Sequence, residues 1–286
     1  MRRLLLASAL ALLACAATPA QAPTAPYLFI QLSDPQFGMF TADRDFVQET
    51  ANFEFAVAAV NRLKPDFIVI TGDLVNRPGD AAQMDEFDRI RARIDPAIAV
   101  YEMPGNHDVE NVPTPESLAA YTARYGRDRY VFRHRNLVGI VLNSSLIHSP
   151  DRAPDAYEAQ LAWLRTELDA ARASGAPHIV IFQHHPWFIE KADEPDEYFN
   201  LPLMRRTPLL ALFREAGVRT LVSGHFHRNA VTTDAGFEAV TTGAVGMPLG
   251  GSRSGLRVFR VTDEAITHRY LEFGDVPNAI DPANAL

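Results

Sequence analysis

The chain has 286 residues, 47% of them hydrophobic, which is enough for one large domain or two small ones. Its 27 Lys and Arg residues and 35 Asp and Glu residues give a formal net charge of −8. An acidic chain without a basic stripe is a poor candidate for binding nucleic acid, because such binding depends on cations that meet the phosphate backbone. The net charge does not exclude a small phosphate substrate, since a metal site reverses the local field.

The first residues resemble an export signal rather than part of the fold. Arg2 and Arg3 give a basic start, and residues 4–13 form an apolar run. The run is shorter than the roughly 20 residues that a membrane-spanning helix needs. We therefore predict a secretory signal and tether over residues 1–22, and we expect the mature protein in the periplasm or the cell envelope.

Cys15, the only cysteine, follows Leu12, Leu13 and Ala14. This stretch resembles the lipobox of bacterial lipoproteins, although Leu13 is unusual at its place in that motif. Two alternatives are open: lipid attachment at Cys15, which would anchor the chain to a membrane, or ordinary cleavage after Ala20 or Ala22, which would discard the cysteine. We favour lipid attachment. In both cases the mature body has no cysteine pair for an internal disulfide.

From Tyr27 onward, short apolar runs alternate with amphipathic segments. The runs are rich in β-branched and aromatic residues, which is typical of strands buried on both faces. The predicted strands are residues 27–32, 67–71, 98–103, 137–142, 178–182 and 219–222.

Helical spacing occupies the stretches between these strands. Apolar residues recur at intervals of three, four and seven over residues 46–60 and again over 157–171, with shorter stripes at 87–94 and 209–213. We predict Asp155 as the N-cap of the second helix.

After Gly224 the pattern changes to short strands at residues 231–233, 238–242, 256–261 and 265–270, followed by a loose tail over 274–286. A βα half followed by a β-rich end predicts helices packed outside stacked sheets.

Polar clusters follow five of the predicted strands. They are Ser33-Asp34-Pro35-Gln36, Gly72-Asp73, Gly105-Asn106-His107-Asp108, Gln183-His184-His185-Pro186 and Gly224-His225-Phe226-His227. Ligands of open α/β sheets bind at the carboxyl ends of the strands, so these clusters are expected to meet at one edge. Carboxylates, imidazoles and an amide oxygen suit divalent ions such as Mn, Fe and Zn. Each cluster alone has an alternative as turn chemistry, but five in this order are hard to explain as turns.

In this order the clusters resemble the signature of the calcineurin-like metallophosphoesterases: Asp-x-His, Gly-Asp, Gly-Asn-His-Asp/Glu, a His, and Gly-His-x-His. The chain matches all of it except the first His, where Gln36 stands. The likeness covers residues 27–273. Further stretches at 33–38, 182–186, 198–200, 224–229 and 255–257 resemble the subfamily of calcineurin-like phosphoesterase domain-containing proteins, regarded as Ser/Thr protein phosphatases.

The resemblance implies an α/β fold, a four-layer α/β/β/α sandwich of two mixed β-sheets flanked by helices. It also implies two divalent metal ions, of Mn, Fe, Zn or Mg, joined by a bridging Asp73. One metal would be held by Asp34, Gln36, Asp73 and His227, and the other by Asp73, Asn106, His184 and His225. His185 is expected to point away.

The resemblance further implies how the reaction proceeds. A hydroxide held between the two metals would attack phosphorus, and His107 would donate a proton to the leaving oxygen. Asp108 is a candidate to orient His107.

Substrate contacts have weaker signals. Arg77, Arg205 and Arg206 are candidates for binding the phosphate, since a guanidinium binds phosphate oxygens bidentately. The alternative is that Arg205 and Arg206 open a solvated helix. Residues 190–197 form an acidic loop flanked by aromatic residues, which would either wall the substrate pocket or pack as a surface flap.

Three functions are open at this point. The leading hypothesis is a phosphomonoesterase, including one that acts on phosphoproteins; the second is a phosphodiesterase on cyclic nucleotides or phospholipid head groups. The export signal disfavours phosphoproteins, since kinase substrates are mostly cytoplasmic. The third is a non-catalytic metal-binding module, which only Gln36 favours and the intact His107 disfavours. Nothing in the sequence indicates the oligomeric state.

The lipid anchor gives a first prediction. Cys15→Ser should move the protein from the membrane fraction to the soluble exported fraction, because the lipid would have no attachment point. Cell fractionation measures the location of the protein, and mass spectrometry identifies its mature N-terminus. A wild-type protein that is already soluble, or whose terminus lies downstream of Cys15, would contradict lipid attachment.

Overall fold

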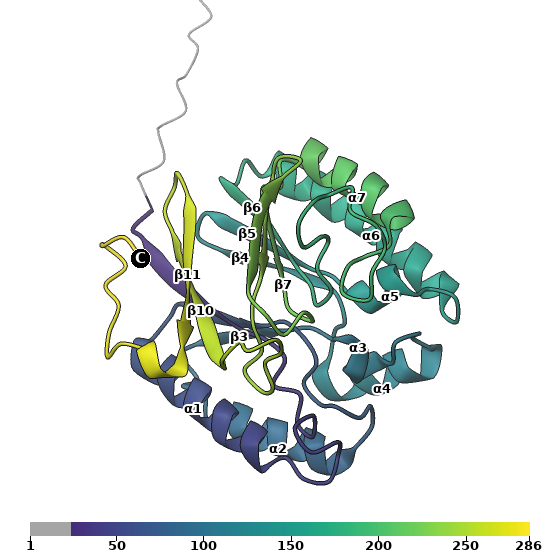
Figure 1. Ribbon diagram of the computed structural model, residues 1–286. Coiled ribbons are helices and arrows are strands. Elements are labelled where there is room, and N and C mark those ends of the chain that lie inside the picture. The colour runs from purple at the N-terminus through teal and green to yellow at the C-terminus, as the bar shows by residue number, and fades with distance from the viewer. Residues whose placement is uncertain (1–23) are drawn as a thin grey trace, which may run out of the picture.

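Two mixed β-sheets lie face to face in the computed structural model, which describes residues 24–286 (Figure 1). The predicted export signal and the lipid attachment at Cys15 lie outside these residues. Among the described residues, no helix combines the length and the apolar character needed to cross a membrane.

The first sheet has the strand order β11-β10-β1-β2-β3. Its strands are β1 (Tyr27–Leu32), β2 (Phe67–Ile70), β3 (Ala99–Glu102), β10 (Gly255–Val261) and β11 (Ile266–Glu272). β1, β2 and β3 are parallel, whereas β10 is antiparallel to both β1 and β11. The carboxyl ends of the three parallel strands therefore meet at one edge of this sheet.

The second sheet has the order β4-β5-β6-β7-β9-β8. Its strands are β4 (Tyr130–His134), β5 (Leu137–Val141), β6 (His178–Phe182), β7 (Thr220–Ser223), β8 (Ala230–Asp234) and β9 (Phe237–Thr241). β5, β6, β7 and β9 are parallel, and the outer strands β4 and β8 are antiparallel to their neighbours.

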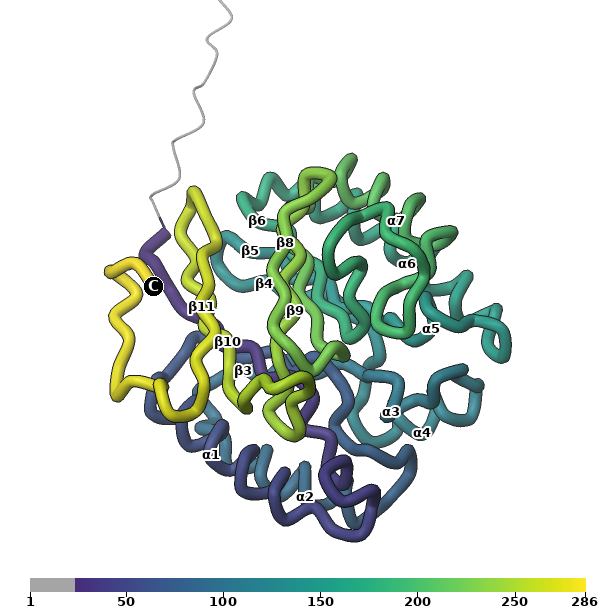
Figure 2. The backbone as a smooth tube through the Cα atoms, viewed as in Figure 1, coloured from purple at the N-terminus to yellow at the C-terminus, as the bar shows by residue number. Residues whose placement is uncertain are grey.

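Helices cover the outer face of each sheet, and the tube in Figure 2 follows the same path. α1 (Val47–Leu63), α2 (Ala81–Arg91) and α4 (Pro115–Tyr125) contribute to the apolar cluster outside the first sheet. α6 (Pro154–Ala173) and α7 (Leu203–Ala216) contribute to the cluster outside the second. The shorter helices are α3 (Asn106–Val109), α5 (Ser144–His148) and η1 (Phe273–Asp275). This arrangement confirms the predicted four-layer α/β/β/α fold class.

A third apolar cluster fills the space between the sheets. Phe29 of β1 is 0% exposed and lies at its centre. Its ring stacks on Phe67 and Phe259 of the same sheet, at centroid distances of 4.8 and 4.4 Å, and meets the edge of Phe182 from the other sheet at 5.9 Å. Aromatic contacts of this kind join the two sheets.

Three local features differ from the sequence predictions. β4 and α4 were not predicted, because β4 is a half-exposed edge strand and α4 buries only Leu118 and Tyr121. Asp155 is not an N-cap: α6 begins at Pro154, with Ala153 at the cap position and no side-chain cap bond.

The C-terminal segment is not a loose tail. Val276, Ile280 and Leu286 pack against the outer cluster of the first sheet. The Arg260 side chain also donates a hydrogen bond of 2.7 Å to the carbonyl of Pro282.

The stacked position of Phe29 gives a stability prediction. Phe29→Ala should lower the free energy of unfolding by about 3–5 kcal/mol, because it leaves a cavity between the sheets. Phe40→Ala is the control, since Phe40 is 39% exposed, and it should cost much less. Urea denaturation measures both variants. Equal losses would contradict the central packing role of Phe29.

Candidate metal centre

Loops from both sheets bring their polar side chains to one place. Asp34 and Gln36 follow β1, Asp73 follows β2, and Asn106 follows β3. From the second sheet, His184 follows β6, and His225 and His227 follow β7. The parallel strands of the two sheets therefore deliver all seven side chains from their carboxyl ends, where ligands of α/β sheets bind.

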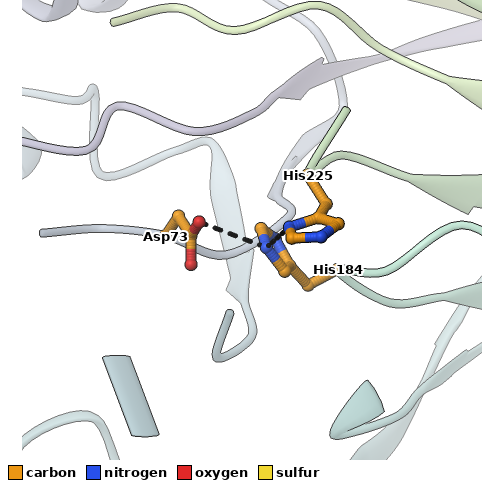
Figure 3. A group of neighbouring side chains, drawn as sticks. All are labelled: Asp73, His184 and His225. Atoms are coloured by element: carbon orange, nitrogen blue, oxygen red, sulfur yellow. Dashed lines mark hydrogen bonds and ion pairs between the residues drawn. The ribbon is translucent and has the colours of Figure 1, made fainter. Parts of the chain in front are cut away.

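One group is formed by Asp73, His184 and His225, which are all buried (Figure 3). Nε2 of His184 lies 3.2 Å from Oδ2 of Asp73, 3.0 Å from Oδ1 of Asn106 and 3.1 Å from Nδ1 of His225. Asn106 is oriented by its own amide nitrogen, which donates a hydrogen bond of 2.9 Å to Asn111. Four possible ligand atoms thus converge on one point.

A second group is formed by Asp34, Asp73 and His227, with ligand atoms within 4.8 Å of one another. Nε2 of His227 lies 3.4 Å from Oδ1 of Asp34. Gln36 is also buried, and its Oε1 has no hydrogen-bond partner among residues 24–286, whereas its Nε2 donates to Oδ1 of Asn76 at 3.1 Å. Asp73 belongs to both groups, so a carboxylate is shared between them.

The outer nitrogen of each imidazole is held by a main-chain carbonyl. Nδ1 of His184 bonds to Thr71 at 2.8 Å, Nε2 of His225 to Tyr198 at 3.1 Å, and Nδ1 of His227 to Met247 at 2.5 Å. A carbonyl only accepts, so each outer nitrogen carries a proton. In a neutral ring, the inner nitrogen then presents its lone pair to the other ligands.

The inward lone pairs and carboxylates repel one another unless a cation lies between them, and this donor set fits divalent metals. The pKa shifts of His184 and His225 agree with a donor set of this kind. Burial lowers the pKa of His184, but the Asp73 and Asp34 carboxylates outweigh it and raise that pKa to about 9. Burial and the neighbouring His184 lower the pKa of His225 to about 3. The centre therefore favours one positive charge near Asp73 and neutral imidazole at His225.

The backbone of the ligand loops is strained. Asp34, Gln36, Asp73, His225 and His227 have φ angles of 50°, 39°, 50°, 66° and 55°, in a region that residues other than glycine rarely adopt. Such conformations cost free energy and tend to cluster at functional sites. This backbone strain falls at five of the seven candidate ligand residues, which indicates that the loops are held in place for function.

Glycines at the contacts between loops allow the loops to approach one another. A methyl group added at Gly224 would lie 2.7 Å from Oδ2 of Asp34, and one added at Gly72 would lie 2.6 Å from the nitrogen of Gly105. Both distances are too short for a side chain, so glycine at these positions is required by the packing of the ligand loops.

His107 lies beside this centre. Its main-chain nitrogen donates to Oδ1 of Asp73 at 2.9 Å, and its Nδ1 lies 2.6 Å from the carbonyl of Asn76. Asp108 does not bond to the His107 ring. Its carboxylate instead accepts hydrogen bonds from the main-chain nitrogens of Leu74 and Gly105, at 2.9 and 2.7 Å. Asp108 thus joins two ligand loops, and the Asn76 carbonyl orients His107.

His185 is absent from both groups of ligands, but it packs against one of them. Its Nδ1 lies 2.9 Å from Oγ of Ser144, and its ring centroid lies 4.3 Å from that of His225. It therefore packs against the His225 ring without joining either group of candidate ligands.

The three arginines lie in different environments. Arg77 pairs with Asp43 at 3.2 Å and is largely exposed. Arg205 donates to the carbonyl of His148 at 2.9 Å. Arg206 is 0% exposed and donates to the carbonyls of Trp187 and Glu194. The predicted phosphate contact does not fit Arg206, because its guanidinium is enclosed beneath the loop that it supports.

Sequence reasoning missed the partners that orient the ligands. Three of them are main-chain carbonyls, of Thr71, Tyr198 and Met247, and a fourth carbonyl, of Asn76, orients His107. A carbonyl is present at every position, so no residue type signals this role. Asn111 is a side-chain partner, and its place five residues after Asn106 is the one sequence signal available.

Comparison with known proteins agrees with this geometry. Residues 27–229 match the family model described as calcineurin-like phosphoesterase. The serine/threonine-protein phosphatase CPPED1 of Bos taurus is 39% identical over 266 residues, covering 88% of this chain and 85% of that protein.

Two solved structures share the fold at 14% identity. GAP50, described as the anchor in the inner membrane complex of Plasmodium, has a TM-score of 0.68 and covers 89% of this chain and 87% of its own. The purple acid phosphatase PPD1 of yellow lupin (Lupinus luteus) has a TM-score of 0.66, covering 88% of this chain and 52% of its own. Together, the family match and the CPPED1 relative show that this chain belongs to the calcineurin-like phosphoesterases and is a phosphoesterase.

Proposed function

We propose that the protein hydrolyses phosphate monoesters at two divalent metal ions, in the manner of a Ser/Thr phosphatase. The observation that carries this proposal is the position of His107, whose main-chain nitrogen bonds to the shared carboxylate of Asp73. The name of the 39% identical relative, a serine/threonine-protein phosphatase, favours monoesters over diesters. The fold alone does not separate an enzyme from a binding protein, since a similar fold occurs in a protein described as an anchor.

The proposed ligands divide into two sets around Asp73. Asp34, Gln36 and His227 complete one set, and Asn106, His184 and His225 complete the other. When bound, the two metals would lower the pKa of a water and neutralise charge on the phosphoryl oxygens. Nitrogen and oxygen ligands without a thiolate suit Mn or Fe, and they accommodate Zn and Mg.

His107 is the proposed proton donor to the leaving oxygen. Its Nδ1 is held by the Asn76 carbonyl at 2.6 Å, which fixes the ring and leaves Nε2 for the substrate. Asp108 keeps the His107 loop against the Asp73 loop through its bonds to Gly105 and Leu74. We assign Arg77 and Arg205 as the remaining candidates for contact with the substrate phosphate.

A pair of variants separates metal binding from proton donation. Asp73→Ala should lose both metals, because the shared carboxylate is removed. His107→Gln should keep both metals and lower kcat by about 10²–10⁴-fold, with a smaller loss on aryl phosphates, whose leaving groups need less protonation. His178→Gln, at the opposite end of β6 from His184, is the matched control.

The measurements are metal stoichiometry and kcat on aryl phosphate monoesters and diesters. Loss of metal in His107→Gln would show that its role is assigned wrongly, and faster turnover of the diester would favour a phosphodiesterase.

Gln36 should make the two metal sites unequal. An amide oxygen is a weaker ligand than an imidazole for Mn, Fe or Zn, so the metal beside Gln36 should bind less tightly. Gln36→His should tighten that binding step by about 10-fold while leaving the tighter step unchanged. Calorimetric titration of the metal-free protein measures both steps. Two equally tight sites in the wild type, or no change in Gln36→His, would place Gln36 outside the ligand set.

A further inference from the structure

A cavity of about 300 Å³ lies beside the ligand loops. Phe226, which stands between His225 and His227 in the sequence, forms one wall, and Phe199 forms another. The Phe199 ring centroid lies 5.6 Å from that of His225 and 5.1 Å from that of Phe226. The aromatic wall of the cavity is therefore adjacent to His225, one of the proposed metal ligands.

The loop that forms the rest of the cavity is fixed by internal hydrogen bonds. The Glu194 carboxylate accepts from the main-chain nitrogens of Ile189, Glu190 and Lys191, at 2.8, 2.7 and 2.9 Å. Nδ2 of Asn200 donates to the same carboxylate at 2.7 Å. From below, the buried Arg206 donates to the carbonyls of Trp187 and Glu194. The cavity is therefore preformed, as ligand sites usually are.

The Glu194 carboxylate is occupied by these hydrogen bonds, whereas the carboxylates of Glu190 and Glu197 take no part in them. Glu190 and Glu197 are exposed, line the cavity, and form no ion pair within the described part of the chain. Residues 190–197 contain five acidic residues and one lysine. The cavity therefore has a negative charge that the loop itself does not balance.

Aromatic rings add a second attraction for a cation. Phe199 and Phe226 both line this negative cavity, and an aromatic ring attracts ammonium and guanidinium groups to its face. Phe226 already takes part in one such contact, since the Arg228 guanidinium lies 4.9 Å from its centroid. Carboxylates beside aromatic rings favour a positively charged occupant over a neutral or anionic one.

We propose that this cavity binds an ammonium or guanidinium group on the alcohol portion of the substrate. The substrate is then a phosphate ester that carries a positive charge close to the phosphoryl group. This inference rests on the proposed phosphomonoesterase function and adds the chemical class of the ester.

The test compares substrates that differ only in this charge. One pair consists of phosphoserine peptides with Lys or norleucine next to the phosphoserine. The other consists of an aminoalkyl phosphate and the alkyl phosphate of equal length. The metal-loaded protein should show a kcat/KM higher by roughly 5-fold or more for the cationic member, which is the size expected for a partly exposed charge contact with an aromatic wall. The preference should fall as salt is added, because the cavity is open to screening.

Variants locate the contact. Glu190→Gln with Glu197→Gln should bring the ratio of the two kcat/KM values close to one. Neither side chain makes a hydrogen bond or ion pair within residues 24–286, so neutralising them should not disturb the loop. Glu264→Gln is the matched control, since Glu264 is exposed in the turn between β10 and β11, at the end of the first sheet opposite the metal centre. It should keep the wild-type ratio.

The outcomes separate this inference from the function on which it rests. Preference in the peptide pair alone identifies a basic side chain as the occupant, and preference in the alkyl pair alone identifies a small ammonium ester. No preference in either pair, or one that survives the double substitution, overturns the inference. If the wild type also fails to hydrolyse an aryl phosphate, the proposed function is wrong. The cavity is then tested by calorimetry with phosphonate analogues of the two peptides, and equal affinities overturn it.

Discussion

The buried carboxylate of Asp73 is the constraint around which this protein is built. It is 1% exposed, belongs to both groups of ligand atoms, and faces Nε2 of His184 at 3.2 Å. A buried charge is costly unless it is compensated, so positive charge must collect around it. Burial alone would raise the pKa of Asp73, but His184 and His107 hold that pKa below its ordinary value. The same field that attracts these protons would hold metal ions.

The two sheets bring the candidate ligands together around the buried carboxylate of Asp73. Each sheet supplies loops from parallel strands, and the aromatic layer around Phe29 and Phe182 fixes the sheets relative to each other. The loops must then approach more closely than side chains allow, which explains Gly72 and Gly224. They must also hold strained backbone at the ligands, and the bonds of Asp108 to Leu74 and Gly105 oppose that strain by joining two of the loops. The stability of the apolar layers thus supports an arrangement that would be unfavourable in isolation.

Sequence patterns predicted the fold and the composition of the centre because both leave side-chain signals. A buried strand is an apolar run, and ligands such as Asp34 or His225 follow it as polar residues beside proline or glycine. The features that were missed lack such signals. β4 is an edge strand with an intermittent apolar pattern, and the tail packs through three isolated apolar residues. Arg206 is a candidate phosphate contact by its charge, with a solvated helix position as the alternative, but the folded loop fits neither, because Arg206 is buried and donates to two main-chain carbonyls. Asp108 was interpreted as the partner of its neighbour, yet its carboxylate reaches main-chain nitrogens of another loop.

Gln36, which stands where the family pattern has a histidine, is linked through Asn76 to His107. The side-chain oxygen of Asn76 accepts from Nε2 of Gln36 at 3.1 Å, and its main-chain oxygen lies 2.6 Å from Nδ1 of His107. Its amide nitrogen in turn donates to Asp43 at 2.9 Å. An imidazole at position 36 would carry its nitrogens at other positions on a rigid ring, so the bond to Asn76 would change. The Gln36 amide donates to Asn76 through Nε2 and leaves Oε1, on the same planar group, without a partner among residues 24–286. The residue that departs from the family pattern is therefore matched to a neighbour that also holds the proposed proton donor, which favours a coordinated variant of the site over a decayed one.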